Sequence, residues 1–131
     1  MAWTVTTLSD SSESIVLSCI ASAAEARDAD AIDVSSYTNG DDTDILHIEY
    51  VEWSCPPLIS GTASGLLTID YHASSPQKVL ELSGTGSIGV NTPGVISKPA
   101  NTGATGFNGD IALTSTGAAT LIISLRKVSG F

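Results

Sequence analysis

Apolar and polar residues alternate along most of the chain, and this period of two is typical of half-buried strands. The clearest run is Ile45–Trp53, where Leu46, Ile48 and Tyr50 share one face and the residues between them are mostly polar. This pattern recurs throughout the sequence. We expect strands at Trp3–Leu8, Ser14–Ala21, Ala31–Ser35, Ile45–Trp53, Leu67–Tyr71, Val79–Leu82, Asp110–Thr114 and Thr120–Arg126.

About eight short strands predict a single all-β domain over residues 1–131, folded as an antiparallel, jelly-roll-like β-sandwich. The stretch Ala21–Ala29 is rich in alanine but has no apolar stripe, so we expect a loop there, or at most one or two helical turns. The expected core consists of Leu46, Ile48, Tyr50, Leu67, Ile69, Leu80, Leu82, Leu121, Ile123 and Leu125.

The segment Gly84–Gly109 breaks this regularity, because it holds seven glycines and two prolines and few large apolar residues. A loop of this length gains too little burial of its own to offset the entropy of ordering it. It is either a surface loop without a role or a segment ordered by a partner, and we favour the partner. We expect three apolar residues of this segment and one near each end of the chain to contact that partner. They are Trp3, Ile88, Ile96, Phe107 and Phe131.

At the start of this segment, the run Ser83–Gly89 reads SGTGSIG and matches the glycine spacing of a dinucleotide-binding turn. Such a turn must open a helix that receives the pyrophosphate. Residues 90–99 contain two prolines and a further glycine, which disfavour a helix. We therefore expect no nucleotide cofactor, and we expect the glycines to allow sharp turns and close backbone approach.

Charge is distributed unevenly over the 131 residues, whose net charge is −9. Residues 1–55 carry eleven acidic residues and one basic residue, and the remainder carries three acidic and four basic residues. This charge argues against sequence-independent binding to nucleic acid or to anionic membranes. The sequence has no secretory signal and no apolar run that would span a membrane, so we expect synthesis in the cytoplasm.

Candidate chemistry is sparse. The two histidines, His47 and His72, read as surface residues, and the chain has no G-x-S-x-G elbow, although its many serines leave a catalytic triad open. Cys19 and Cys55 lie in apolar strand-like surroundings, so buried free thiols are favoured over a disulfide. We predict a protein without catalytic residues or cofactors.

The acidic turn at residues 39–44 is the best candidate for a metal site, because Asp41, Asp42 and Asp44 supply the oxygen ligands that calcium prefers. The spacing matches no EF-hand loop, and no glutamate closes it. We therefore expect a solvated turn, so that millimolar calcium leaves the melting temperature unchanged.

Two runs in the sequence resemble small virion structural proteins of tailed bacteriophages. One covers Gly103–Gly117 and continues in Thr120–Lys127, and the other is the opening run Met1–Thr6. The resemblance implies a capsid decoration or cement protein, often a homotrimer, that binds the major capsid protein on the outside of the virion. It transfers no individual binding residue. A tail, fibre or receptor-binding component and a carbohydrate-binding module or small enzyme remain the alternatives.

Overall fold

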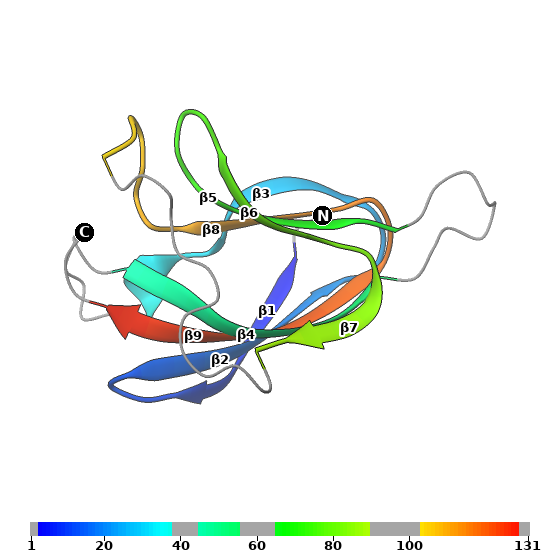
Figure 1. The fold of residues 1–131 in the computed structure, drawn as a ribbon, viewed down its shortest axis with the longest axis horizontal. Helices are drawn as coiled ribbons and strands as arrows, with labels where there is room; N and C mark the ends of the chain where they lie inside the picture. Colours follow the sequence, from blue (N-terminus) through cyan, green and yellow to red (C-terminus); the bar gives the residue numbers. More distant parts are fainter. Residues whose placement is uncertain (1–2, 38–44, 56–64, 90–102, 129–131) are drawn as a thin grey trace.

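The computed structural model describes residues 3–37, 45–55, 65–89 and 103–128, which form two packed antiparallel sheets (Figure 1). This confirms the predicted all-β sandwich, with nine strands in the described residues rather than eight. One short 3-10 turn, η1, covers Val34–Ser36. The strands are β1 (Thr4–Asp10), β2 (Ser14–Ala21), β3 (Glu25–Ile32), β4 (Ile45–Cys55), β5 (Leu67–Tyr71), β6 (Gln77–Leu82), β7 (Gly84–Ile88), β8 (Ile111–Ser115) and β9 (Ala119–Val128).

The strand order is that of a jelly roll with one additional strand. The larger sheet has the order β1-β2-β9-β4-β7, and the smaller has the order β3-β8-β5-β6. From β2 to β9 the chain crosses from one sheet to the other at each connection except the β5–β6 hairpin, which joins neighbours in one sheet. The added strand β1 pairs with β2 at the edge of the larger sheet.

The core lies between the sheets and is mainly aliphatic. The alternation of apolar and polar residues predicted eight core residues correctly, because each of the eight points inward from a regular stretch of strand. Tyr71 is also fully buried, and its hydroxyl donates a hydrogen bond to the backbone oxygen of Leu46. The confirmed core residues are Leu46, Ile48, Leu67, Ile69, Leu82, Leu121, Ile123 and Leu125.

A β-bulge in β4 changes the face on which its side chains lie. The register between β4 and β9 shifts between Ile48 and Tyr50, which leaves Glu49 as an extra residue. After the bulge the alternation is inverted, so that Val51 is fully buried while Tyr50 lies half-buried on the outer face. The prediction that Tyr50 belongs to the core was therefore wrong.

A second irregularity affects β6. Ile69 pairs with Leu80, but the next residue of β5, Asp70, pairs with Lys78, so that Val79 is the extra residue. Leu80, predicted as a core residue, packs against the core while remaining partly exposed. Its position on an edge strand explains this, because no further strand covers it in the described residues.

The stretch expected to be a loop after Ala21 forms most of β3 instead. Glu25–Ile32 pairs with β8 across two register shifts. The strand then ends earlier than expected, and η1 follows it at Val34–Ser36. The pattern was misleading because β3 is a bulged edge strand that lacks a regular apolar face.

The glycine-rich start of Gly84–Gly109 is also a strand rather than a loop, since Gly84–Ile88 forms β7 and pairs with β4 without a register shift. Gly84 has a positive φ of 67° at the corner where the chain passes from β6 to β7. At Gly86 a Cβ atom would lie 2.9 Å from the Trp53 ring. Turn formation and close approach thus account for these glycines, as the sequence predicted.

Candidate interaction surface

The described residues contain no cluster that suggests catalysis or metal binding. They include no group of three or more His, Cys, Asp or Glu side chains that could hold a metal ion. Asp41, Asp42 and Asp44 lie outside this part of the chain. Both cysteines are fully buried free thiols, and burial raises the pKa of Cys19 to about 12. A thiol with such a pKa has no significant thiolate at neutral pH and is not a nucleophile.

The two histidines lie far apart in the topology. His47 is half-buried on the outer face of β4, opposite Arg126. His72 follows β5, and its backbone nitrogen donates to the backbone oxygen of Asp110. The Nδ1 atom of His72 is buried without a hydrogen-bond partner in the described structure. A catalytic general base is normally oriented by a hydrogen bond to its second ring nitrogen. The described surroundings of His72 are therefore those of a structural residue.

The best-buried carboxylates have structural partners. The side chain of Asp70 on β5 is only 6% exposed, and its Oδ1 accepts a hydrogen bond of 2.7 Å from Nη2 of Arg27 on the edge strand β3, across β8. Asp110 accepts a hydrogen bond of 2.9 Å from the backbone nitrogen of Val34, which ties η1 to the start of β8. These contacts hold edges and turns on the sandwich and leave neither group free for chemistry.

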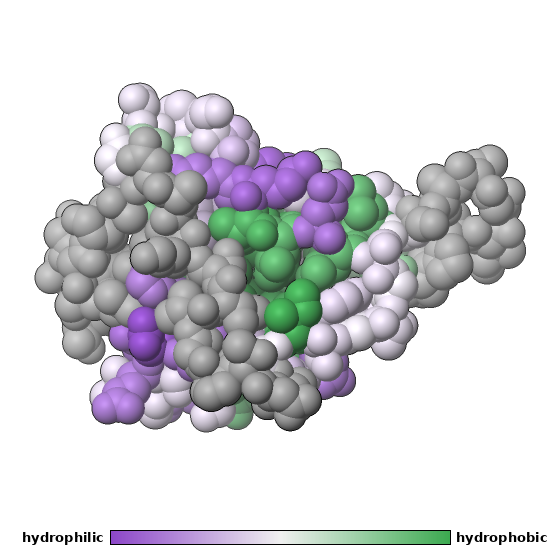
Figure 2. Space-filling view, in the orientation of Figure 1, coloured by the Kyte–Doolittle hydropathy of each residue, from purple (hydrophilic) through white to green (hydrophobic). Residues whose placement is uncertain are grey.

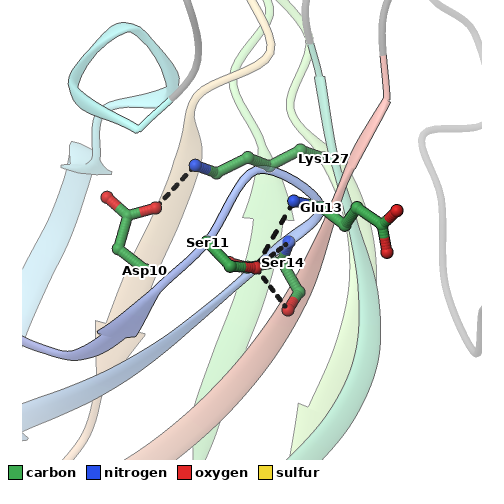
Figure 3. Close-up of polar contacts among 5 residues, drawn as sticks. All are labelled: Asp10, Ser11, Glu13, Ser14 and Lys127. Atoms are coloured by element: carbon green, nitrogen blue, oxygen red, sulfur yellow. Dashed lines mark hydrogen bonds and ion pairs between the residues drawn. The ribbon is translucent and has the colours of Figure 1, made fainter.

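Polar contacts also join the β1–β2 turn to the end of β9 (Figure 3). Ser11 Oγ accepts hydrogen bonds from the backbone nitrogens of Glu13 and Ser14. Lys127 contacts both sides of the turn, since its Nζ lies 2.6 Å from Asp10 Oδ1 and its backbone nitrogen donates to the Glu13 oxygen. The cluster closes a turn and has no cavity or reactive group.

Apolar side chains, by contrast, gather on the outer face of the larger sheet. Val16 and Ile20 alternate with the buried residues of β2 and therefore face outward, and Ile20 is 47% exposed. Ile122 lies beside them on β9, opposite Ser18. Leu8, 55% exposed, is the extra residue of a bulge in β1 beside Val16. We call this set, Leu8, Val16, Ile20 and Ile122, the aliphatic face.

A second apolar surface lies on the side of the sandwich where β6 and β7 run. Figure 2 shows it as a green area between the polar band over β6 and the pale band over β7. On β6, Val79 and Leu80 pack against the core and are partly buried, and on β7, Ile88 is 38% exposed. We call Val79, Leu80 and Ile88 the side patch. Exposed apolar groups with polar surroundings are typical of protein contacts.

The structure separates the five predicted contact residues. Ile88 is exposed at the side patch, whereas Trp3 is only 6% exposed and belongs to the core. Phe107 packs against the core, with its ring centre 6.2 Å from that of Tyr71. Ile96 and Phe131 lie outside the described residues. Trp3 thus stabilises the sandwich rather than presenting a free surface.

Sequence reasoning missed Leu8 and Ile20. For Ile20 the signal was present, because it follows the buried Ile15, Leu17 and Cys19 in the opposite phase of the alternation. For Leu8 the signal was also present, because it lies out of phase with Trp3 and Val5, which pack in or against the core. Tyr50 also lies on this outer face, where a hydrogen bond of 2.7 Å to Glu52 raises the pKa of its hydroxyl.

No protein-family model, curated protein or solved structure matches the chain. The described residues contain no helix long and apolar enough to cross a membrane. The surfaces above are therefore interpreted on their own chemistry.

Proposed function

We propose that the chain is a non-enzymatic virion structural protein, a capsid decoration or cement protein that binds the outside of the major capsid protein shell and stabilises it. The observation that carries this proposal is the aliphatic face, a set of exposed and partly exposed apolar side chains on the outer side of a five-stranded sheet. Such a face binds another protein by excluding water, and it requires no reactive group. The resemblance of Gly103–Gly117 and Thr120–Lys127 to small phage virion proteins supplies the class of partner.

The charge distribution supports a protein partner over nucleic acid or lipid. A net charge of −9 repels phosphate groups, whereas the outward side chains of β2 from Val16 to Ile20 are uncharged. An uncharged surface loses little solvation when it is covered. The proposed protein is made in the host cytoplasm, assembles on the outer capsid surface and acts as a homo-oligomer, with the trimer implied by the resemblance.

Copy number in purified virions tests this proposal. Quantitative mass spectrometry should find the chain in numbers near those of the major capsid protein. A few copies per particle would select a tail or fibre component instead, and absence from particles would overturn the virion assignment. The Ile20→Glu variant should bind capsid shells from which this chain has been removed at least about tenfold more weakly than the wild type does. The reason is that the new carboxylate would be buried in the contact without a partner. Ser75→Glu, on the exposed turn before β6, is the matched control.

One observation favours a second candidate, a carbohydrate-binding module. Tyr50, expected in the core, lies on the outer face with its hydroxyl bonded to Glu52. A partly exposed ring beside a carboxylate is a combination that can stack on a sugar and accept its hydroxyl hydrogens. Titration of a panel of oligosaccharides into the wild type and Tyr50→Ala would test it. Binding that Tyr50→Ala abolishes would support this function over capsid decoration.

A further inference from the structure

The two sheets differ in how their edge strands are protected. The edges of the smaller sheet carry charged residues, including Arg27 and Asp28 on β3 and Lys78 and Glu81 on β6. At the edges of the larger sheet, β7 has no charged residue and β1 has only its last residue, Asp10. Charged side chains on an edge strand prevent it from pairing with another chain. Only the larger sheet lacks this protection at both of its edges.

Backbone regularity follows the same division. The pairing of β3 with β8 contains two register shifts, and that of β6 with β5 contains one. The pairing of β7 with β4 has none. The pairing of β1 is regular over Thr4–Thr7 and shifts only after it. Because bulges disturb the outward row of N–H and C=O groups, β7 and the first half of β1 are the edges best formed to accept a further strand.

Exposed aliphatic side chains accompany both of these edges. The described residues include three large hydrophobic side chains that are exposed, and two of them are Leu8 on β1 and Ile88 on β7. The third, Ile20, lies on β2, which is not an edge strand. Among the residues that the structure describes, an edge strand with no further strand beside it and an apolar anchor therefore coincide at each end of the larger sheet.

We propose that β1 of one copy pairs with β7 of a second copy, so that the larger sheet continues head to tail from subunit to subunit. Within the sheet, four successive antiparallel pairings separate β1 from β7, and the two strands therefore run in the same direction. Subunits related by rotation about an axis along the strands would form a parallel pair. Repetition of one such contact gives a closed ring when the rotation closes.

A second copy is the occupant that fits both edges. One kind of contact covers β1 and β7 together, whereas a symmetric β1–β1 pair would leave Ile88 and the edge of β7 uncovered. The two strands also differ in size: β7 has glycine at positions 84 and 86, while β1 carries the bulky Leu8. Copies that each carry a charge of −9 approach best through uncharged surfaces. The contact belongs to the chain alone and does not depend on a capsid.

Sedimentation equilibrium of the purified chain tests the proposal without virions. The wild type should associate with increasing concentration. Leu8→Glu and Ile88→Glu should each weaken association at least about tenfold, because each places an unpaired carboxylate in the contact. Ser75→Glu is the matched control, since it adds the same charge on the exposed turn before β6, in the other sheet, and it should associate like the wild type.

Mixing separates head-to-tail pairing from symmetric pairing. Leu8→Glu keeps an intact β7 edge and Ile88→Glu keeps an intact β1 edge, so an equimolar mixture should form dimers with one chain of each variant. Amide exchange of β1 and β7 should slow as the wild type associates. A monomeric wild type, an effect of only one edge variant, a mixture that stays monomeric, or dissociation by Ser75→Glu would each overturn the proposal. None of these outcomes bears on whether the chain is found in virions.

Discussion

Gly89, which follows β7, offers the sharpest test of how that strand is held. Its φ is +104°, and a Cβ atom there would lie 2.4 Å from the backbone oxygen of Glu49 and 3.1 Å from the Cα of Tyr50. Both neighbours are main-chain atoms of the bulge in β4, so no side-chain rotation can relieve the contact. Gly89→Ala must therefore displace the end of β7 from β4 or distort the bulge.

The loss of stability expected for Gly89→Ala follows from comparison with the two glycines inside β7, Gly84 and Gly86. Gly84 has a φ of +67° and open space around the Cβ position, so alanine there meets only the left-handed backbone cost of about 1–2 kcal/mol. Loss of unfolded-chain freedom offsets about 0.4–1 kcal/mol of it. At Gly86, alanine crowds the Trp53 ring at 2.9 Å, and overpacking of this kind costs about 1–3 kcal/mol. Gly89→Ala combines backbone strain with overpacking, and we expect a loss of about 2–4 kcal/mol.

Urea denaturation of the three alanine variants measures these differences. The expected order of destabilisation is Gly89→Ala first, then Gly86→Ala, then Gly84→Ala, with unchanged m values if the unfolded states are alike. Were Gly89→Ala no more destabilising than Gly84→Ala, the close approach of β7 to the bulge would not exist. The account of this edge strand would then be wrong.

Three further predictions concern the sandwich itself. Ile123→Ala should lower the free energy of unfolding by about 2–5 kcal/mol, because Ile123 is fully buried; an unchanged urea midpoint would contradict its burial. Arg27→Ala should cost about 1–3 kcal/mol, more than Lys78→Ala in the same assay, because Arg27 pairs with the buried Asp70 and Lys78 with an exposed partner. The pKa of Cys19 is raised in the fold, so its thiol ionises first in the unfolded chain, and stability should fall as pH rises above about 9. Cys19→Ala should reduce that slope, and an identical pH profile in this variant would refute the assignment.

The fold was predictable from sequence where strands are regular and half-buried. In β2, β5 and β9 the buried apolar residues recur at every second position, so Leu67, Ile69, Leu121 and Ile123 could be assigned to the core without a structure. The number of such strands and their short spacing were enough to predict a sandwich. In these strands the local pattern and the tertiary packing agree.

The prediction failed where one strand depends on another. Tyr50 and Val51 exchange faces because the bulge at Glu49 adds one residue to β4, and the bulge is defined only by pairing with β9. Glu25–Ile32 is a strand because β8 provides its partners, although half of its residues are charged and they do not alternate regularly with the apolar ones. Leu8 and Ile20 are different, since each lies out of phase with the core-facing residues of its own strand and was visible in the sequence alone.

The bulge in β4 and the glycine after β7 form one structural device, although 40 residues separate them in the sequence. Because Glu49 is an extra residue, its backbone oxygen reaches toward the position where the chain leaves β7, and only a residue without a Cβ fits against it. The same bulge places Tyr50 on the outer face and keeps Val51 in the core. Of the glycines that resemble a nucleotide-binding turn, Gly86 and Gly89 are thus explained by close approach to β4, and Gly84 by its positive φ. The uncharged, side-chain-poor edge that results is the surface to which we assign the second subunit.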